Sequence, residues 1–153
     1  MATQEFSRSL PMLLYRALDA VMPRFRKIFN EFGLTEQQWR VLRVLWQDDG
    51  IAFGDLAAVT RIPAPSLVGV VDRLAKQGLV GRRRSDADRR QVFIHATEKG
   101  RDLHRRVRPK VDDAYAELRS SIDADQWQQL IGSLERIASL EADIEERQRA
   151  VNQ

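Results

Sequence analysis

"PAPSLVGVVDRLAKQGLVGRRRSDADRRQVFIH", residues 63–95, changes its periodicity halfway along. The first part places apolar residues at helical spacing, with Pro63 or Pro65 at its start and Gly78 at its end. The second part consists of two short runs, "LVGRRR" and "QVFIH", on either side of the six residues 85–90. Such runs around a short turn are typical of a β-hairpin. A helix followed directly by a hairpin is therefore the centre of the predicted fold.

The residues upstream extend this unit. "FGDLAAVTR", residues 53–61, predicts a short helix, and a tight turn at 60–64 joins it to the next one, as in a helix-turn-helix. "LTEQQWRVLRVLW", residues 34–46, predicts a further helix in which Thr35 and Gln38 form a capping box. A helix-turn-helix that leads directly into a hairpin is the winged-helix arrangement. The expected fold class is mainly α, an α+β winged helix.

Long amphipathic segments flank the predicted winged helix. We expect one domain over residues 1–153, with a winged-helix lobe at 36–96 and helices at 9–34 and 97–148. Thr97 and Asp123 are the expected caps of the two C-terminal helices. The flanking helices carry more apolar surface than a core of this size needs, and pairing across a two-fold axis would bury it. The sequence therefore predicts a homodimer in which these helices form the dimerisation layer.

Positive charge is concentrated in the middle of the chain. The 25 basic residues comprise 21 arginines and 4 lysines, and residues 61–110 hold 14 basic side chains against 5 acidic ones. Arginine is well suited to phosphates and base edges, so this distribution favours a polyanion-binding module. A solvated basic face is the alternative, and charge counting alone does not reject it.

Several chemistries lack the residues they need. The chain contains no cysteine, which excludes a disulfide scaffold, a thiolate zinc site and a thiol redox sensor. Two histidines, His95 and His104, are too few for an obvious metal cage, and we find no catalytic triad or phosphate-cradling glycine loop. No long apolar run or signal pattern occurs. We expect no catalytic site, no cofactor, no metal and no membrane contact, in a cytoplasmic protein.

Three segments carry a resemblance to a known family. "LTEQQWRVL", "PSLVGVVDRLAKQGLVGRRRSDADRR" and "ATEKG" occur in this order and spacing, and the chain resembles the MarR family of bacterial transcription regulators over nearly its whole length. Within the family it is most similar to regulators of aromatic-acid catabolism of the homoprotocatechuate type. The resemblance implies a symmetric dimer that binds a pseudo-palindromic operator in double-stranded DNA and usually represses a nearby gene. It also implies release by a small phenolic or aromatic carboxylate effector.

The resemblance also implies roles for the hairpin, which would be the wing. Family members carry an Asp followed two positions later by an Arg, here Asp88 and Arg90. Arg90 is expected to enter the minor groove, whose negative potential is deepest where the groove is narrow. Asp88 is expected to pair with an arginine and hold the tip in shape. The arginines expected to contact backbone phosphates are Arg82, Arg83, Arg84 and Arg89.

The recognition helix is poor in side chains that could read bases. Ser66 is the expected polar contact, with Ala64 and Pro65 against thymine methyl groups. Gly69 is also among the expected DNA-binding residues, because small residues let the helix approach closely, although some relatives carry a basic residue at this position. The remaining expected contacts are phosphate clamps, Arg61 and Arg73. A surface ion pair is an equally good interpretation of Arg73.

The resemblance also implies a ligand crevice between the dimerisation helices and the winged-helix lobe. Trp39 and Arg43 are four residues apart on one helix, so a ring could stack on the indole while the guanidinium holds a carboxylate. Arg16 is a second candidate cation, and His104 could line the same crevice. The alternative is that Trp39 belongs to the core and both arginines form ion pairs.

Two other functions remain open for the whole chain: a winged helix for protein contact, and an architectural DNA-binding module without a ligand. Activation instead of repression also remains open.

Overall fold

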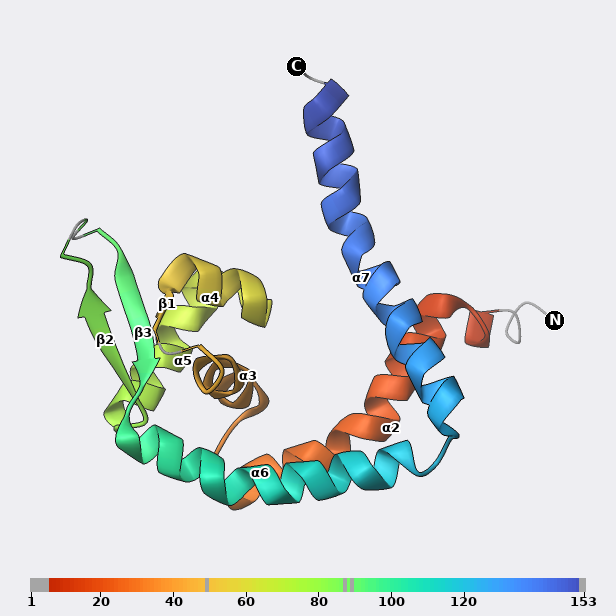
Figure 1. The fold of residues 1–153 in the computed structure, drawn as a ribbon, viewed down its shortest axis with the longest axis horizontal. Coiled ribbons are helices and arrows are strands. Elements are labelled where there is room, and N and C mark those ends of the chain that lie inside the picture. Colours follow the sequence, from red (N-terminus) through yellow and green to blue (C-terminus); the bar gives the residue numbers. More distant parts are fainter. Residues whose placement is uncertain (1–5, 49, 87, 89, 152–153) are drawn as a thin grey trace. The chain divides into compact units, whose positions relative to one another are not determined.

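A computed structural model describes residues 6–48, 50–86, 88 and 90–151, with side chains up to Leu140. The chain divides into two compact units, Met1–Ala114 and Tyr115–Gln153. The first unit contains the predicted winged helix. Figure 1 labels the helices and strands and colours them in the order of the sequence.

Four helices of the first unit occur where apolar periodicity predicts them. They are α2 (Leu10–Glu31), α3 (Glu36–Leu45), α4 (Phe53–Thr60) and α5 (Ala64–Lys76). The capping box that begins α3 is confirmed: the Gln38 amide N–H donates to Thr35 Oγ1 at 3.2 Å, and the Thr35 amide donates to Gln38 Oε1 at 2.9 Å.

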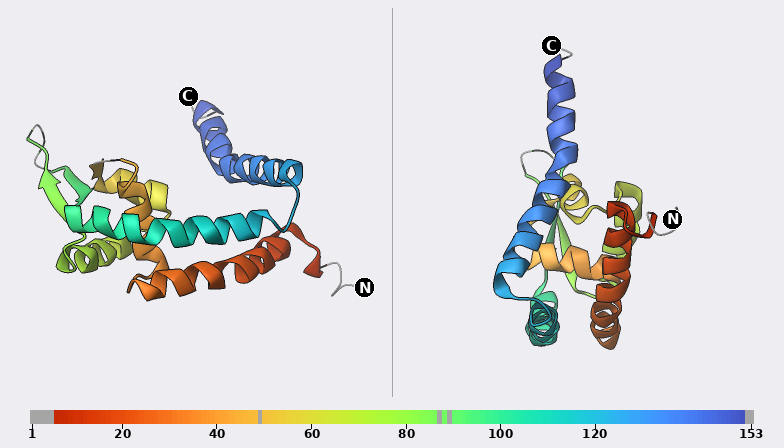
Figure 2. Two further views of the ribbon diagram at one scale, coloured as in Figure 1. Left: turned by 60° about the horizontal axis from the view of Figure 1, so that its bottom comes forward. Right: turned by 90° about the vertical axis from the view of Figure 1, so that its right-hand side faces the viewer.

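The predicted hairpin is also confirmed, and it belongs to a small antiparallel sheet. Its strands are β2 (Val80–Arg84) and β3 (Val92–Ala96), and it projects from the lobe in Figures 1 and 2. A strand that the sequence analysis did not predict, β1 (Ile51–Ala52), pairs with β3, which gives the order β1-β3-β2. Ile51 stands opposite Ile94, whose side chain is fully buried.

Two long helices follow the sheet, α6 (Glu98–Arg119) and α7 (Ala124–Val151). Both predicted caps are present, since Thr97 Oγ1 accepts from the Gly100 amide at 3.1 Å and Asp123 Oδ1 accepts from the Gln126 amide at 2.8 Å. Pro109 lies inside α6 and Pro23 inside α2. The dimerisation role of these helices remains a prediction.

The core of the first unit joins α3, α4, α5, α6 and the inner face of the sheet. Its fully buried side chains are Leu42, Leu45, Leu56, Leu67, Leu74, Ile94, Val41, Val70, Val71 and Val107. Aliphatic packing therefore holds the recognition helix α5 and the hairpin in a fixed relation.

The end of α2 is attached to α6 by the ion pair of Glu31 with Lys110 and by the guanidinium of Arg106 over the Phe32 ring.

Candidate nucleic-acid interface

The second helix of the helix-turn-helix, α5, has one buried and one exposed side. Leu67, Val70, Val71 and Leu74 are fully buried, so these residues pack in the core as predicted and do not face solvent. Four residues in the first turn and a half are exposed: Ala64, Pro65, Ser66 and Val68. Val68 was not selected from the sequence, yet 47% of its surface is exposed beside the predicted reading residues.

The turn between α4 and α5 has a left-handed residue at its centre. Arg61 has φ 53° and ψ 34°, and it ends α4 with its amide donating to the Ala58 carbonyl at 3.3 Å. The next residue, Ile62, is 2% exposed and anchors the turn in the core. This arrangement leaves the Arg61 side chain exposed directly before α5, as a phosphate clamp requires.

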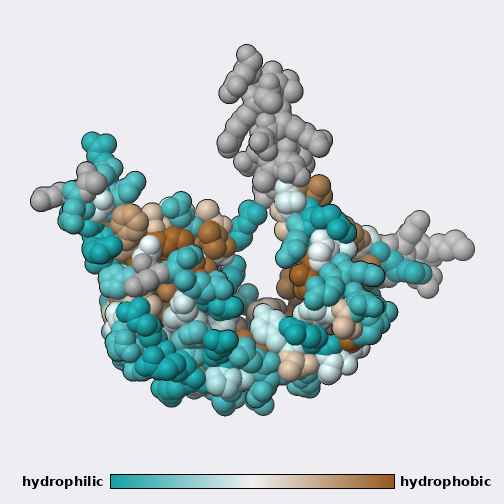
Figure 3. Space-filling view, viewed as in Figure 1, coloured by the Kyte–Doolittle hydropathy of each residue, from teal (hydrophilic) through white to brown (hydrophobic). Residues whose placement is uncertain are grey.

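The same turn carries an apolar surface. Its open hollow is lined by Ala57, Ala58, Val59, Arg61, Ile62, Pro63 and Ala64. Val59 is 61% exposed, and Figure 3 shows hydrophobic atoms over α4 beside the hydrophilic hairpin. Apart from Arg61, every lining side chain is apolar. Contacts with DNA here would be to methyl groups and sugars more than to hydrogen-bonding base edges.

The tip of the hairpin is closed by hydrogen bonds around Asp88. Its carboxylate Oδ1 accepts from the Arg90 amide at 2.9 Å, and its own amide donates to Ser85 Oγ at 3.2 Å. The carboxylate therefore shapes the tip through the backbone of Arg90, and among the described residues it forms no ion pair with a guanidinium, so the expected pairing of Asp88 with an arginine remains a prediction. The Arg90 side chain is exposed, whereas Arg89 lies outside the described residues.

The three arginines of β2 differ in their availability. Arg82 forms an ion pair with Asp72 on α5, so its charge is already partly neutralised. Arg83 and Arg84 are exposed on opposite faces of the strand. In the part of the chain that the structure describes, no ion pair involves Arg83, Arg84 or Arg90. Among the described residues, these three are the hairpin cations most available for contact with DNA, and the prediction for Arg82 is weakened by its ion pair with Asp72.

Arg73 is exposed in the last turn of α5, and its side chain reaches back along the helix. One of its terminal nitrogens is 3.5 Å from the position that a Cβ on Gly69 would take. Among the described residues it forms no ion pair, so the alternative interpretation of Arg73 as a surface salt bridge finds no support. A Cβ at position 69 would therefore be in ordinary van der Waals contact with this guanidinium.

Trp39 belongs to a row of aromatic rings. It stacks on Phe29 with centroids 4.6 Å apart and meets Trp46 edge-on at 5.3 Å, and Trp46 in turn stacks on His104 at 4.4 Å. Trp39 is half-buried and packs against the core, as the alternative interpretation holds. One ring face is occupied by Phe29, so a ligand ring would have to use the remaining surface.

Positive charge lies beside this aromatic row. Burial lowers the pKa of His104, and the charges of Arg108 and Arg43 lower it further. Arg43 is exposed, and the described residues provide no carboxylate partner for it. The structure thus brings together Trp39, Arg43 and His104. Arg16 is exposed on α2, and no described hydrogen bond or ion pair connects it with them.

Other kinds of site are not evident in the described residues. They contain no group of three or more His, Asp or Glu side chains that could hold a metal ion. None of the described helices has the length and apolarity that a bilayer span needs.

Known proteins share this architecture. The MarR family model matches residues 32–91. The homoprotocatechuate degradative operon repressor of Escherichia coli is 36% identical over 132 residues, which cover 86% of this chain and 89% of that protein.

Two solved structures are similar over most of their length. NadR in complex with 4-hydroxyphenylacetate has a TM-score of 0.77 and 34% identity, covering 86% of this chain and 94% of NadR. The repressor CouR bound to a 23-mer DNA duplex has a TM-score of 0.82 and 30% identity, covering 88% of this chain and 95% of CouR. With its helix-turn-helix, basic hairpin and flanking helices, the chain belongs to the MarR family of winged-helix transcription regulators.

Proposed function

We propose that this protein is a ligand-responsive repressor that binds a pseudo-palindromic operator as a homodimer in the cytoplasm. Its regulated genes would serve the catabolism or efflux of aromatic or phenolic acids, and the protein itself would not be an enzyme. The observation that carries the proposal is the exposed start of α5 beside a hairpin whose Arg83, Arg84 and Arg90 are not ion-paired among the described residues.

The expected mode of binding follows from the winged helix. The start of α5 enters the major groove, and the two recognition helices of a dimer must be about 34 Å apart to reach successive major grooves. Arg90 enters the minor groove, while Arg61, Arg73, Arg83 and Arg84 contact phosphates. Phosphate contacts fix the register, and the minor-groove contact adds preference for a narrow groove.

The expected effector is a small aromatic acid. Its carboxylate would bind Arg43, and its ring would lie against the row of Trp39, Trp46 and His104. NadR binds 4-hydroxyphenylacetate, which has this chemistry. A ligand shifts the conformational population only by its differential affinity for the DNA-binding and non-binding forms, so release requires tighter binding to the second form.

The direct test titrates the protein against its own upstream intergenic DNA and a scrambled duplex, with and without 4-hydroxyphenylacetate. We expect selective binding of one dimer per site and release by the acid. Arg43→Ala should bind the operator like the wild type but need about tenfold or more acid for release, because one charge-assisted hydrogen bond contributes about 1.5–3 kcal/mol.

The outcomes separate the candidate functions. Equal, weak binding to both duplexes would favour an architectural module. No binding even at low salt would contradict the proposal and favour a winged helix used for protein contact. Selective binding that no aromatic acid relieves would support the proposed operator binding and contradict the proposed effector.

The apolar start of α5 gives a prediction about DNA chemistry. Replacing thymine by uracil in the operator removes only the 5-methyl group, and we expect weaker binding at the bases that face Ala64, Pro65 and Val68. The loss should be about 0.8 kcal/mol per fully buried methyl, roughly fourfold. It is measured by competition between the two duplexes. Val68→Ala should lose part of this discrimination, and an unchanged affinity for every uracil position would contradict the methyl contacts.

A further inference from the structure

The hairpin of β2 and β3 has an outer face that does not pack on the core. In the β2–β3 register Gly81 stands opposite His95 and Arg83 opposite Phe93. Side chains alternate along a strand, so these residues share the face opposite that of the core residue Ile94. This outer face is also opposite the one on which Arg82 contacts α5.

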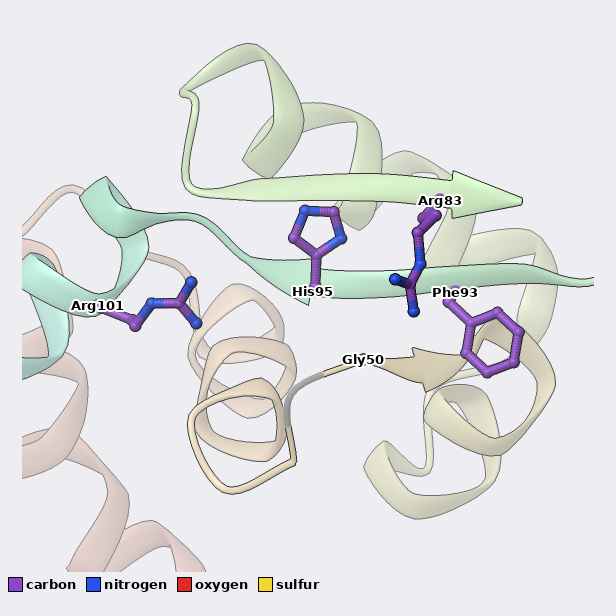
Figure 4. Close-up of a pocket in the computed structure, with 5 residues that line it drawn as sticks. All are labelled: Gly50, Arg83, Phe93, His95 and Arg101. Carbon is purple, nitrogen blue, oxygen red and sulfur yellow. The ribbon is translucent and has the colours of Figure 1, made fainter. Parts of the chain in front are cut away.

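The absence of a side chain at Gly81 determines where His95 lies. A Cβ on Gly81 would be 2.5 Å from His95 Nε2 and 2.6 Å from Cε1, which is too close for any real contact. The imidazole therefore occupies the space beside the β2 backbone that another residue would fill, and it is half-buried there. Figure 4 shows the ring between the two strands.

A small cavity opens beside this imidazole. It has a volume of about 200 Å³ and is lined by Gly50, Arg83, Phe93, His95 and Arg101. Along β3 in Figure 4, His95 is followed by the Arg83 guanidinium and then by the Phe93 ring, with Arg101 on the other side of His95. The Arg101 Nε group lies 3.4 Å from Glu98 Oε2, while Arg83 has no ion pair among the described residues.

We infer that this cavity binds an oxyanion group, a phosphate or a carboxylate, at a site separate from Trp39 and Arg43. The Arg83 guanidinium supplies a planar fork of N–H donors, and such forks match phosphate and carboxylate oxygens. The imidazole adds an N–H donor and Phe93 provides an apolar wall, while the charge of Arg101 is shared with Glu98. A bound anion would connect the wing, through Arg83, with the first turn of α6, through Arg101.

The oxyanion can come from two sources, the DNA backbone or a free small molecule. The first experiment uses inorganic phosphate alone, at constant pH and ionic strength, and follows the imidazole NMR signals of His95 with His104 as internal reference. We expect a saturable shift of the His95 signals. Arg83→Ala should weaken the binding of phosphate about tenfold or more, as expected for loss of a charge-assisted hydrogen bond.

Arg84→Ala is the matched control. Arg84 is the next residue of the same strand, it is also exposed and not ion-paired among the described residues, but it points to the opposite face. This variant should keep the wild-type response. A His95 signal that does not respond to phosphate, that responds equally in Arg83→Ala, or that is lost equally in both variants would overturn the inference.

A second experiment identifies the source of the oxyanion that occupies the cavity. If a DNA phosphate occupies the cavity, a duplex shifts the His95 signals and inorganic phosphate no longer does so in the complex. If a free anion occupies it, phosphate shifts the His95 signals of DNA-bound protein with unchanged affinity. Both results support the site. Because the phosphate titration needs no DNA, a failure of DNA binding would refute the proposed function without deciding the anion site.

Discussion

Gly100→Ala is expected to lower the free energy of unfolding by about 2–3 kcal/mol, the upper range for overpacking a core. A Cβ at this position would lie 2.2 Å from the Leu79 carbonyl oxygen, which also accepts the Thr97 amide at 3.1 Å. The Gly100 carbonyl in turn accepts from Trp46 Nε1 at 3.0 Å. Relief of the clash must therefore move backbone that joins the sheet, α3 and α6.

Gly54→Ala is the control for this prediction. Gly54 lies in α4, and a Cβ there would meet nothing within 4 Å. The helix preference of alanine over glycine, about 0.8–1 kcal/mol in a helix interior and less at this second residue of α4, should then act alone and stabilise the protein slightly. Chemical unfolding at one protein concentration measures both variants. If Gly100→Ala were as stable as Gly54→Ala, the close approach to Leu79 would be disproved.

Arg90→Ala is expected to weaken operator binding about 10- to 100-fold, from the roughly 1–3 kcal/mol of a specific DNA contact. The Arg90 side chain is exposed at the tip, and Asp88 holds its backbone through the 2.9 Å hydrogen bond. Removal of the guanidinium leaves the tip folded, so the loss reports the DNA contact itself. Fluorescence anisotropy with operator and scrambled duplexes measures it.

Two control variants separate minor-groove contact from general attraction. Arg84→Ala should lower affinity for both duplexes alike and reduce the slope of log K against log salt by about 1, as expected for one phosphate contact. Arg105→Ala should have little effect, because this guanidinium is already paired with Glu98 on α6. The minor-groove role fails if Arg90→Ala lowers affinity for both duplexes equally.

Local sequence signals predicted the elements and their ends. Thr35, Thr97 and Asp123 each cap a helix as expected, because a cap depends only on residues within one turn. The hairpin was predictable for the same reason. The strand β1 was not, since two residues become a strand only through pairing with β3, which is distant in the chain.

Contacts between elements that are distant in the chain account for the features that could not be predicted from the sequence. Asp72 was a polar residue on a helix, and only the approach of β2 makes it the partner of Arg82. Gly81 and Gly100 were unremarked in the sequence because their neighbours, His95 and Leu79, come from other segments. Trp39 fitted both the core and a ligand site, and its stacking on Phe29 shows that packing accounts for one face.

The ion pair of Asp72 with Arg82 bears on how quickly a regulator finds its target. A cation that is paired with a carboxylate contributes less to counterion release when the protein binds non-specific DNA. The affinity for non-specific DNA is therefore lower. A dimer carries two such pairs, so we expect it to dissociate sooner from each wrong location. The residence time at decoy sequences is shortened, while contacts made only at the operator are preserved. A carboxylate inside a basic surface thus favours a faster search.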